Sequence, residues 1–503
     1  MTQINLNNLN VFYSQTLIEN LTLTFPGGWT GISGPNGCGK TSLIHCLIAD
    51  LRGSAETSMP HQLQWNGTIT GPSSLCYLPQ LPEPDMEALN DFFYSGDNDH
   101  GRISSLLELK EEWLYRPDEI SQGQKRRLQL ALALAENPEI LILDEPENHL
   151  DQAGRELVIN TLRQYEGIGI IIGHSRNIMN SLCTSTLLIY QKRWHFYQHG
   201  LTESLSLYKA EEKSIRKQRE MLKFDINRQT KQLNNYVRQS AKAERALSKK
   251  GLGRHDHDKK SAIDLARLSG ADKASSSKVS LQKKVISSST AVLGDLQQDR
   301  RWKMGLTILG IKSRRDRLIH IPSGNYPLYE NFSLDLPELS ILADDFIVLR
   351  GANGTGKTGI LNLIHQRIDP AVPLGWIPQE LTGEEKEALL NKYQQLDQRE
   401  KADVMAYFSR MGSDPIQWIQ QQKGSPGEYR KLLMAMIFLC ETELLILDEP
   451  ANHLDIFTIE VIEEALKTYR GAVIMVSHEK EFCSSMINRV WSVNSGRLFL
   501  SET

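Results

Sequence analysis

An acidic motif occurs twice in this chain, in almost the same letters. The two copies read Asp144-Glu145-Pro146-Glu147-Asn148-His149-Leu150-Asp151 and Asp448-Glu449-Pro450-Ala451-Asn452-His453-Leu454-Asp455. Each copy follows a short apolar run, 140–143 or 444–447. An apolar run that ends in two acids is typical of a buried parallel strand that delivers carboxylates to a site at its C-terminal end. The motif therefore predicts two similar α/β halves in one chain.

The repeat keeps a single register over most of the chain. Landmarks that share one spacing indicate an internal duplication. The same spacing of 304 residues separates three pairs of residues, which are Asp144 and Asp448, Gly123 and Gly427, and His174 and His478.

A glycine-rich loop precedes each acidic motif and follows a strand-like run. Glycines let backbone amides turn inward around phosphate oxygens, and the helix that follows adds its positive N-terminus. The lysine of such a loop neutralises the terminal phosphates, and the threonine hydroxyl binds magnesium. The two loops therefore predict two nucleotide sites. They read Gly34-Pro35-Asn36-Gly37-Cys38-Gly39-Lys40-Thr41 and Gly351-Ala352-Asn353-Gly354-Thr355-Gly356-Lys357-Thr358.

Other residues at matched positions complete each set. Gln80 and Gln379 each lie between a phosphate loop and an acidic strand. A histidine follows each first acid by 30 residues, and this equal spacing favours phosphate sensing over a purely structural role. Two signature segments open apolar-rich helices, where a serine hydroxyl and bare amides form a second anion cradle. The signatures are Ser121-Gln122-Gly123-Gln124 and Ser425-Pro426-Gly427-Glu428.

With these motifs the chain resembles the ATP-binding cassette (ABC) proteins. The Asn-His-Leu-Asp ending of both acidic motifs, the tandem arrangement and a charged connector resemble the ABC-F family of ribosome-associated translation factors. The resemblance covers nearly the whole chain. It implies an α/β fold of two P-loop ATP-binding cassette domains, 1–200 and 303–503, joined by a long helical hairpin linker, 201–302. It also implies that the protein is an ATPase.

The resemblance further implies that the two cassettes close head to tail within one monomer, with ATP and Mg²⁺ in each of two sites. Glu145 and Glu449 would polarise the attacking water, and His174 and His478 would hold the γ-phosphate. Magnesium ligands would be Thr41, Gln80 and Asp144 in the first site and Thr358, Gln379 and Asp448 in the second. The first site would take Ser425, Gly427 and Glu428 from the second half, and the second site would take Ser121, Gly123 and Gln124.

The two signatures are not identical. Pro426 stands where the family has a glycine, and proline lacks an amide donor. Gln122 has the same place in the first signature, and Gln124 is matched by Glu428. Both sets of catalytic residues are complete, so we expect two active sites, and the signatures leave open whether their affinity or rate of hydrolysis differs.

Bulk properties fit two domains and a connector. At 503 residues the chain has room for two domains of about 200 residues each. No run of 18 apolar residues occurs, so we expect no membrane-spanning helix. Six scattered cysteines without paired spacing favour a reduced, cytoplasmic protein.

The positive charge of the chain is concentrated in the connector. Residues 201–300 carry 22 of the 57 Lys and Arg residues but only 12 of the 61 acids. Residues 203–249 contain neither proline nor glycine, which predicts a helix of about 65–70 Å. One apolar seam follows this segment, and a second helix within 261–302 is expected to return antiparallel, as in a coiled coil. The seam consists of Tyr208, Ile215, Leu222, Ile226, Leu233 and Val237.

A basic hairpin between acidic bodies favours contact with RNA, because Lys and Arg neutralise phosphates without reading sequence. A solvated coiled-coil spacer remains the alternative. In the ABC-F family the linker reaches the peptidyl-transferase region, so the resemblance implies ribosomal RNA and P-site tRNA as partners, with no DNA. It leaves open whether the chain is a housekeeping translation factor or an antibiotic-resistance protein.

Two other classes of tandem ATPase share some of these features. The ATPase subunit of an ABC importer has a similar length, but its halves are joined by a short connector and one site is often degenerate. A DNA-repair or chromosome-type ATPase has its coiled coil within a cassette. Two complete acid and histidine sets and the basic connector favour the ribosome factor over both.

Overall fold

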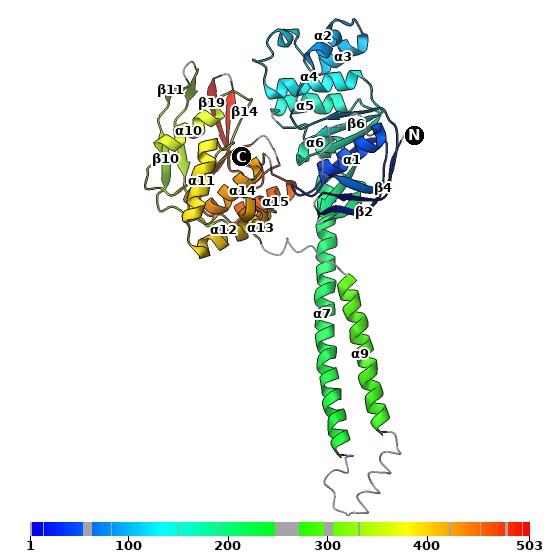
Figure 1. The fold of residues 1–503 in the computed structure, drawn as a ribbon. Coiled ribbons are helices and arrows are strands. Elements are labelled where there is room, and N and C mark those ends of the chain that lie inside the picture. Colours follow the sequence, from blue (N-terminus) through cyan, green and yellow to red (C-terminus); the bar gives the residue numbers. More distant parts are fainter. Residues whose placement is uncertain are drawn as a thin grey trace, which may run out of the picture. The chain divides into compact units, whose positions relative to one another are not determined.

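The computed structural model describes residues 3–13, 15–53, 63–81, 83–148, 150–190, 192–246, 271–295, 305–329, 332–421, 424–452, 454–477, 481–494 and 496–502. The predicted catalytic residue His478 and much of the segment 246–280 lie outside them. The chain forms two compact units (Figure 1). One contains residues 1–204 and 301–503, and the other contains residues 205–300.

The N-terminal half combines two sheets with helices. Its strands are β1 (Ile4–Phe12), β2 (Thr16–Phe25), β3 (Gly28–Ser33), β4 (Gln64–Thr70), β5 (Leu75–Leu78), β6 (Ile140–Asp144), β7 (Ile168–Ile172), β8 (Ser185–Tyr190) and β9 (Arg193–Tyr197). Its helices are α1 (Lys40–Arg52), α2 (Met86–Tyr94), α3 (Asn98–Leu106), the 3-10 helix η1 (Glu111–Tyr115), α4 (Gln122–Ala135), α5 (Gln152–Leu162) and α6 (Arg176–Leu182). In the described residues the small antiparallel sheet has the order β2-β1-β4, and the larger sheet has the order β5-β6-β7-β3-β8-β9.

The order of the larger sheet explains how distant motifs meet. Strand β7 pairs in parallel with both β3, which leads into the phosphate loop, and β6, which carries the acids. The carboxyl ends of parallel strands lie at one edge of a sheet, where ligands bind in such folds. All five residues of β6 and of β7 are buried, as the continuous apolar runs predict for strands covered on both faces.

The C-terminal half repeats this plan. Its strands are β10 (Arg317–Ile321), β11 (Gly324–Tyr329), β12 (Phe332–Leu336), β13 (Leu339–Leu342), β14 (Phe346–Gly351), β15 (Leu374–Ile377), β16 (Leu444–Asp448), β17 (Ala472–Val476), β18 (Arg489–Asn494) and β19 (Arg497–Glu502). Its helices are α10 (Lys357–Arg367), α11 (Gly383–Gln395), α12 (Gln398–Arg410), α13 (Pro415–Gln421), α14 (Pro426–Phe438) and α15 (Ile456–Leu466). Strand β17 again pairs in parallel with the loop-bearing strand β14 and the acidic strand β16.

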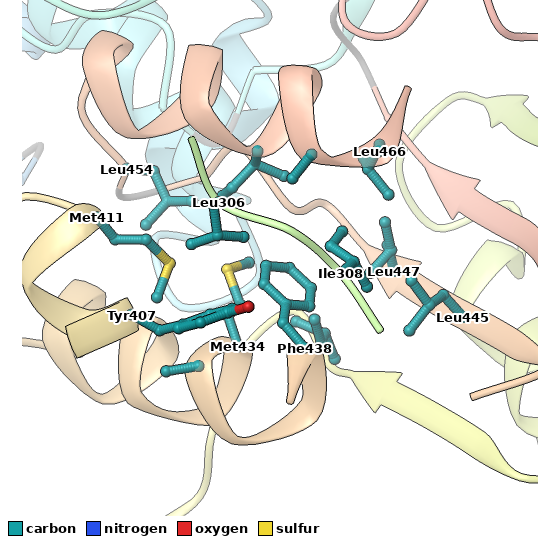
Figure 2. Packing of buried hydrophobic residues seen from close by; sticks show 14 of the residues in the cluster. Leu306, Ile308, Tyr407, Met411, Met434, Phe438, Leu445, Leu447, Leu454 and Leu466 are labelled. Carbon is teal, nitrogen blue, oxygen red and sulfur yellow. The ribbon is translucent and has the colours of Figure 1, made fainter. Parts of the chain in front are cut away.

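The chain enters the C-terminal half through its core. Leu306 and Ile308 are buried beside Phe438 of α14 and Leu447 of β16, and Figure 2 shows their segment passing between these elements. The amide of Leu309 donates to the Phe438 carbonyl at 2.9 Å. The exit from the connector is therefore packed against the signature helix and the acidic strand of the second half.

The connector contains two long helices, α7 (Leu201–Ala246) and α9 (Ala271–Asp295). They run in opposite directions in Figure 1. Along α7 the predicted seam residues 215, 222, 226 and 233 are half-buried, whereas Val237 is 45% exposed. The prediction of an α/β chain with a long helical insertion between its halves is confirmed. No helix in the described ranges has the length and apolar character needed to cross a bilayer.

Candidate functional site

Both phosphate loops join a central strand to the N-terminus of a helix, β3 to α1 and β14 to α10. Two glycines of each loop have a left-handed backbone. The φ angles are 75° at Gly37, 101° at Gly39, 77° at Gly354 and 94° at Gly356. Residues with a Cβ rarely adopt this conformation, so glycine is required for amides to turn inward around an anion. The other loop residues lie in the same turns, and these are Gly34, Pro35, Asn36, Cys38, Gly351, Ala352, Asn353 and Thr355.

The lysines of the two loops are buried and fold back over their own loops. Lys40 Nζ donates to the first two loop carbonyls at 2.7 and 3.0 Å, and Lys357 Nζ donates to the matched pair at 2.9 Å each. Burial lowers the pKa of Lys357, and the nearby acids Glu449 and Asp448 oppose that shift. Each ammonium group is held at the centre of its loop, where a phosphate would accept its protons.

The acids that end β6 and β16 have the chemistry of a divalent cation site. Thr358 Oγ1 donates to Asp448 Oδ2 at 3.0 Å, while Asp448 Oδ1 is buried without a protein partner. Burial raises the pKa of Asp448, and it raises that of Asp144 to about 6. An orphaned carboxylate oxygen beside a threonine hydroxyl fits Mg²⁺, which prefers oxygen ligands. In the first half Tyr77 donates to Asp144 Oδ2 at 3.3 Å, and Thr41 is exposed at the start of α1.

The glutamate that follows each acid has an unusual backbone. Glu145 and Glu449 have φ angles of 46° and 49°, a left-handed conformation that is uncommon outside glycine. Such strain clusters at functional sites. In the first half Gln80 and Asn148 both donate to Glu145 Oε2, at 2.6 and 2.7 Å. Burial raises the pKa of Glu449 to about 7, with Asp448 adding to the shift.

The signature serines cap the helices that follow them. Ser121 Oγ accepts from the Gln124 amide, and the Gln124 side chain accepts from the Ser121 amide. Ser425 and Glu428 form the same capping box at the start of α14. Pro426 is the first residue of that helix, where its missing amide donor costs nothing within the helix. Gly123 and Gly427 are buried in the first turns.

His174 is buried at the end of β7 and meets the C-terminal half. Its Nδ1 lies 3.4 Å from Ser33 Oγ and accepts from the Ile456 amide at 3.3 Å, while Nε2 has no protein partner. Burial lowers its pKa to about 3, so the ring is neutral at physiological pH. The predicted counterpart His478 is outside the described residues.

A cavity of about 500 Å³ brings the second phosphate loop together with the first signature. Lys357, Thr358, Asp448 and Glu449 line it from the C-terminal half. Ser121 faces them from the N-terminal half, as the head-to-tail expectation requires. The N-terminal half also contributes Gln122, Asn148, Leu150 and Arg155, and the C-terminal half also contributes Asn353, Gly354, Gly356, Gln379, Glu380, Asn452 and Val476.

Two buried arginines of this region were not identified from the sequence. Arg126 of α4 donates to the carbonyl of Gln80, and Arg430 of α14 donates to that of Gln379 at 3.0 Å. Each arginine joins the signature helix to the glutamine loop of its own half. Their spacing of 304 residues is the signal that could have identified them.

Comparison with known proteins identifies both halves. The ABC transporter family matches residues 18–148 and 334–452. The chain is 26% identical to the ribosome protection protein VmlR of Bacillus subtilis, over 95% of this chain and 85% of that protein. It is 25% identical to the erythromycin resistance ATP-binding protein MsrA of Staphylococcus epidermidis, over 92% and 91%.

Solved structures share the fold. A complex of an archaeal ribosomal stalk protein with the archaeal ribosome recycling factor aABCE1 has a TM-score of 0.57 at 16% identity, and the match covers 97% of this chain and 88% of that one. The RNase-L inhibitor has a TM-score of 0.56 at 15% identity, with 97% and 89% covered. The chain is therefore an ATPase with two copies of the ABC transporter domain, and its homologues are ABC-F proteins.

Proposed function

We propose that this ATPase binds the ribosome when ATP holds its two cassettes closed, that it acts on translation through its connector, and that ATP hydrolysis releases it. The single observation that carries this proposal is the basic connector, 201–302, placed between two complete nucleotide sets, 1–200 and 303–503. The name of VmlR, a ribosome protection protein, supports a ribosomal target, and that of MsrA, an erythromycin resistance protein, makes a drug-bound ribosome the first one to test. A ribosomal role implies a cytoplasmic location.

In this proposal each site hydrolyses ATP by positioning and charge neutralisation. When bound, Mg²⁺ would neutralise phosphate charge beside Asp144 or Asp448. Lys40 and Lys357 neutralise the terminal phosphates from within their loops. Glu145 and Glu449 take up the proton of the attacking water, and Gln80 orients Glu145 through the 2.6 Å hydrogen bond. His174 and His478 contact the γ-phosphate.

Closure is proposed to require both halves at each site. Ser121 and Gly123 serve the second phosphate loop, and Ser425 and Gly427 serve the first. The capping boxes support this role, since they hold each serine at a positive helix N-terminus. Nucleotide between the halves then acts as the contact that keeps them together, and loss of the γ-phosphate removes it.

The first residues of the connector, and the described residues just beyond its far end, are packed in the cassettes, which supports its coupling to nucleotide state. At the first end the Asn180 side chain bonds both the hydroxyl and the amide of Thr202, at 2.6 and 3.0 Å. At the second end Leu306 and Ile308 lie in the core beside the signature helix.

The connector is proposed to be a coiled-coil hairpin that contacts ribosomal RNA and P-site tRNA. Half-buried positions recur at alternating spacings of four and three residues along both helices, as in a heptad seam. They include 215, 219, 222, 226, 229, 233 and 236 in α7, and 279, 282, 286, 289 and 293 in α9. Lysines and arginines on the exposed faces would neutralise phosphates, so binding should weaken as salt rises.

The experiment uses the double variant Glu145→Gln with Glu449→Gln, which should bind ATP but hydrolyse it slowly. It is centrifuged with 70S or 80S ribosomes at moderate salt, with ATP and separately with ADP. We expect co-sedimentation with ATP and little with ADP. Absence of co-sedimentation, despite demonstrated ATP binding, would refute the proposal and make membrane permeases the next partners to test.

A further inference from the structure

A small cavity near the centre of the nucleotide-binding unit is lined by chemically unequal counterparts of the two halves. Glu147 and Arg155 line it from the N-terminal half, and their counterparts at the repeat spacing of 304, Ala451 and Ile459, line it from the C-terminal half. One half therefore supplies a buried acid and a buried base where the other supplies two apolar side chains. The repeat is symmetric in its motifs but not in this cavity.

Arg155 reaches a second, functional cavity. It lies on α5, is only 7% exposed, and also lines the cavity that contains Glu449, Lys357 and Thr358. Its positive charge lowers the pKa of Glu449, against the larger opposing effects of burial and Asp448. Lys357 and Arg430 are the other positive groups that act on Glu449. Arg155 and Lys357 line the cavity of Glu449 with it, and Arg155 is the cation that the opposite half supplies.

The guanidinium group is held at a cost to folding. Its Nε and Nη1 atoms are buried and have no protein partner. Burying such donors without hydrogen bonds is unfavourable, and Ile459 shows that the matched position accepts an apolar side chain. Packing alone therefore gives no reason for an arginine here.

Glu147 provides a means of keeping the arginine in place. Glu147 Oε1 accepts from the amides of His174 and Ser175, at 3.2 Å each, while Oε2 is buried without a protein partner. The cavity that Glu147 and Arg155 share has about 30 Å³ of space for small molecules. A water fits that space and has polar partners on both residues. A water-bridged pair would connect the histidine turn of the first site to the arginine of the second.

We infer that Arg155 is a positioning residue that the N-terminal half supplies to Glu449, and that the two ATP sites therefore hydrolyse ATP by unequally supported glutamates. The Arg155 guanidinium orients the Glu449 carboxylate toward the attacking water when the halves are closed. Glu145 lines the small cavity together with Arg155 and Ile459, but hydrogen bonds from Gln80 and Asn148 already hold its carboxylate. The inference rests on the head-to-tail pairing proposed above.

The test compares Arg155→Leu, Arg155→Lys and a matched control, Arg163→Leu, which removes an exposed arginine at the end of the same helix. Each is made in the Glu145→Gln background, which leaves the glutamate of the second site, and in the Glu449→Gln background, which leaves that of the first. Steady-state hydrolysis gives kcat and KM. Binding of a fluorescent ATP analogue and the melting temperature are measured on the same proteins.

In the Glu145→Gln background we expect Arg155→Leu to lower kcat at least about tenfold with KM changed less than about twofold, because orientation of the base is lost while ATP contacts remain. Arg155→Lys should recover part of the rate. In the Glu449→Gln background the same change should alter kcat by no more than about twofold. Analogue affinity and melting temperature should not fall, and Arg163→Leu should change none of these quantities.

The inference would be overturned by equal losses of kcat in both backgrounds, by a fall in analogue affinity or by a fall in melting temperature, because each would show a structural role. An unchanged kcat in the Glu145→Gln background would also overturn it. If either background has no ATPase activity by itself, the Arg155 variants are measured in the parent protein. The same criteria then apply, namely a lower kcat, an unchanged KM and partial recovery with lysine. Ribosome binding does not enter these measurements, so a failure of the proposed function leaves their outcome readable.

Discussion

Lys431 Nζ lies 2.9 Å from Asp455 Oδ2, and both side chains are almost completely buried. Burial alone would raise the pKa of Asp455, but Lys431 and His174 outweigh it and hold that pKa well below its usual range. The matched pair in the N-terminal half is arranged differently. Arg127 stacks on Trp113 at 4.9 Å, and Asp151 accepts from an amide of its own helix. The acidic motifs of the two halves therefore end in unequal electrostatic environments.

Replacing Lys431 by leucine should destabilise the protein by about 3–5 kcal/mol, because it leaves the buried Asp455 charge uncompensated. Chemical denaturation provides the measurement. Arg127→Leu is the matched control and should cost about 1 kcal/mol, since it removes a partly exposed contact with an aromatic ring. Similar losses for the two variants would contradict the buried-pair account.

Leu306→Ala should destabilise the C-terminal half by about 2–5 kcal/mol, because it leaves a cavity beside the signature helix. Leu309 is 41% exposed three residues later, so Leu309→Ala should stay within about 0.5 kcal/mol. Denaturant titration followed by tryptophan fluorescence distinguishes the two. If Leu306→Ala is as mild as its control, the exit of the connector is not part of the core.

The charge of Glu449 should make nucleotide-free stability depend on pH. Its pKa is raised from 4.5 to about 7 in the folded state. Above pH 7 the ionised carboxylate therefore lowers the free energy of unfolding, and below about pH 4.5 the carboxyl is protonated in both states and this loss disappears. The free energy of unfolding should therefore gain a contribution as pH falls from 7 to 4.5. Glu449→Gln removes the titrating group and should lose that contribution. Identical pH dependence in the two proteins would refute the shift.

Magnesium should bind through the pair formed by Thr358 and Asp448. One Asp448 oxygen is buried without a protein partner, and the other lies 3.0 Å from the Thr358 hydroxyl. A bound cation would take the unpartnered oxygen as a ligand and so offset the cost of burying the carboxylate. In the Glu145→Gln background, Asp448→Asn should remove the second site's share of the increase in melting temperature that Mg²⁺ adds to ATP. Ser492→Ala, in strand β18 of the same sheet, is the control and should retain the increase. Loss of the increase in both variants would indicate a general destabilisation.

Much of this arrangement could be predicted from the sequence because its signals are local or repeated. The apolar runs 140–143 and 444–447 predicted β6 and β16, each of which ends one residue later at its first acid, and the absence of proline and glycine predicted α7 to within a few residues. The repeat spacing aligned the motifs of the two halves. The placement of the signature serine of one half opposite the loop of the other depended on the family resemblance, since no pattern within one half indicates its partner.

The parts that escaped prediction depend on tertiary contacts. Arg155 and Ile459 occupy matched positions of α5 and α15, and only the fold shows that both line one cavity. The sequence indicates that Pro426 removes an amide donor from the second signature. In the structure Pro426 is the first residue of α14, a position where a helix needs no amide donor. Val237 satisfied the seam spacing but is exposed, because the buried face of α7 passes through position 236 instead.

The most direct test of the central claim is to shorten the connector in the protein that is held closed. Residues 246–280 are replaced by a short glycine-serine turn in the Glu145→Gln, Glu449→Gln variant, and ATP-dependent co-sedimentation with ribosomes is measured beside the full-length variant. Retained ATP binding and melting temperature are the folding controls. We predict that ribosome binding is lost while both controls are unchanged. Undiminished ATP-dependent binding by the shortened protein would contradict a connector that carries the ribosomal contact.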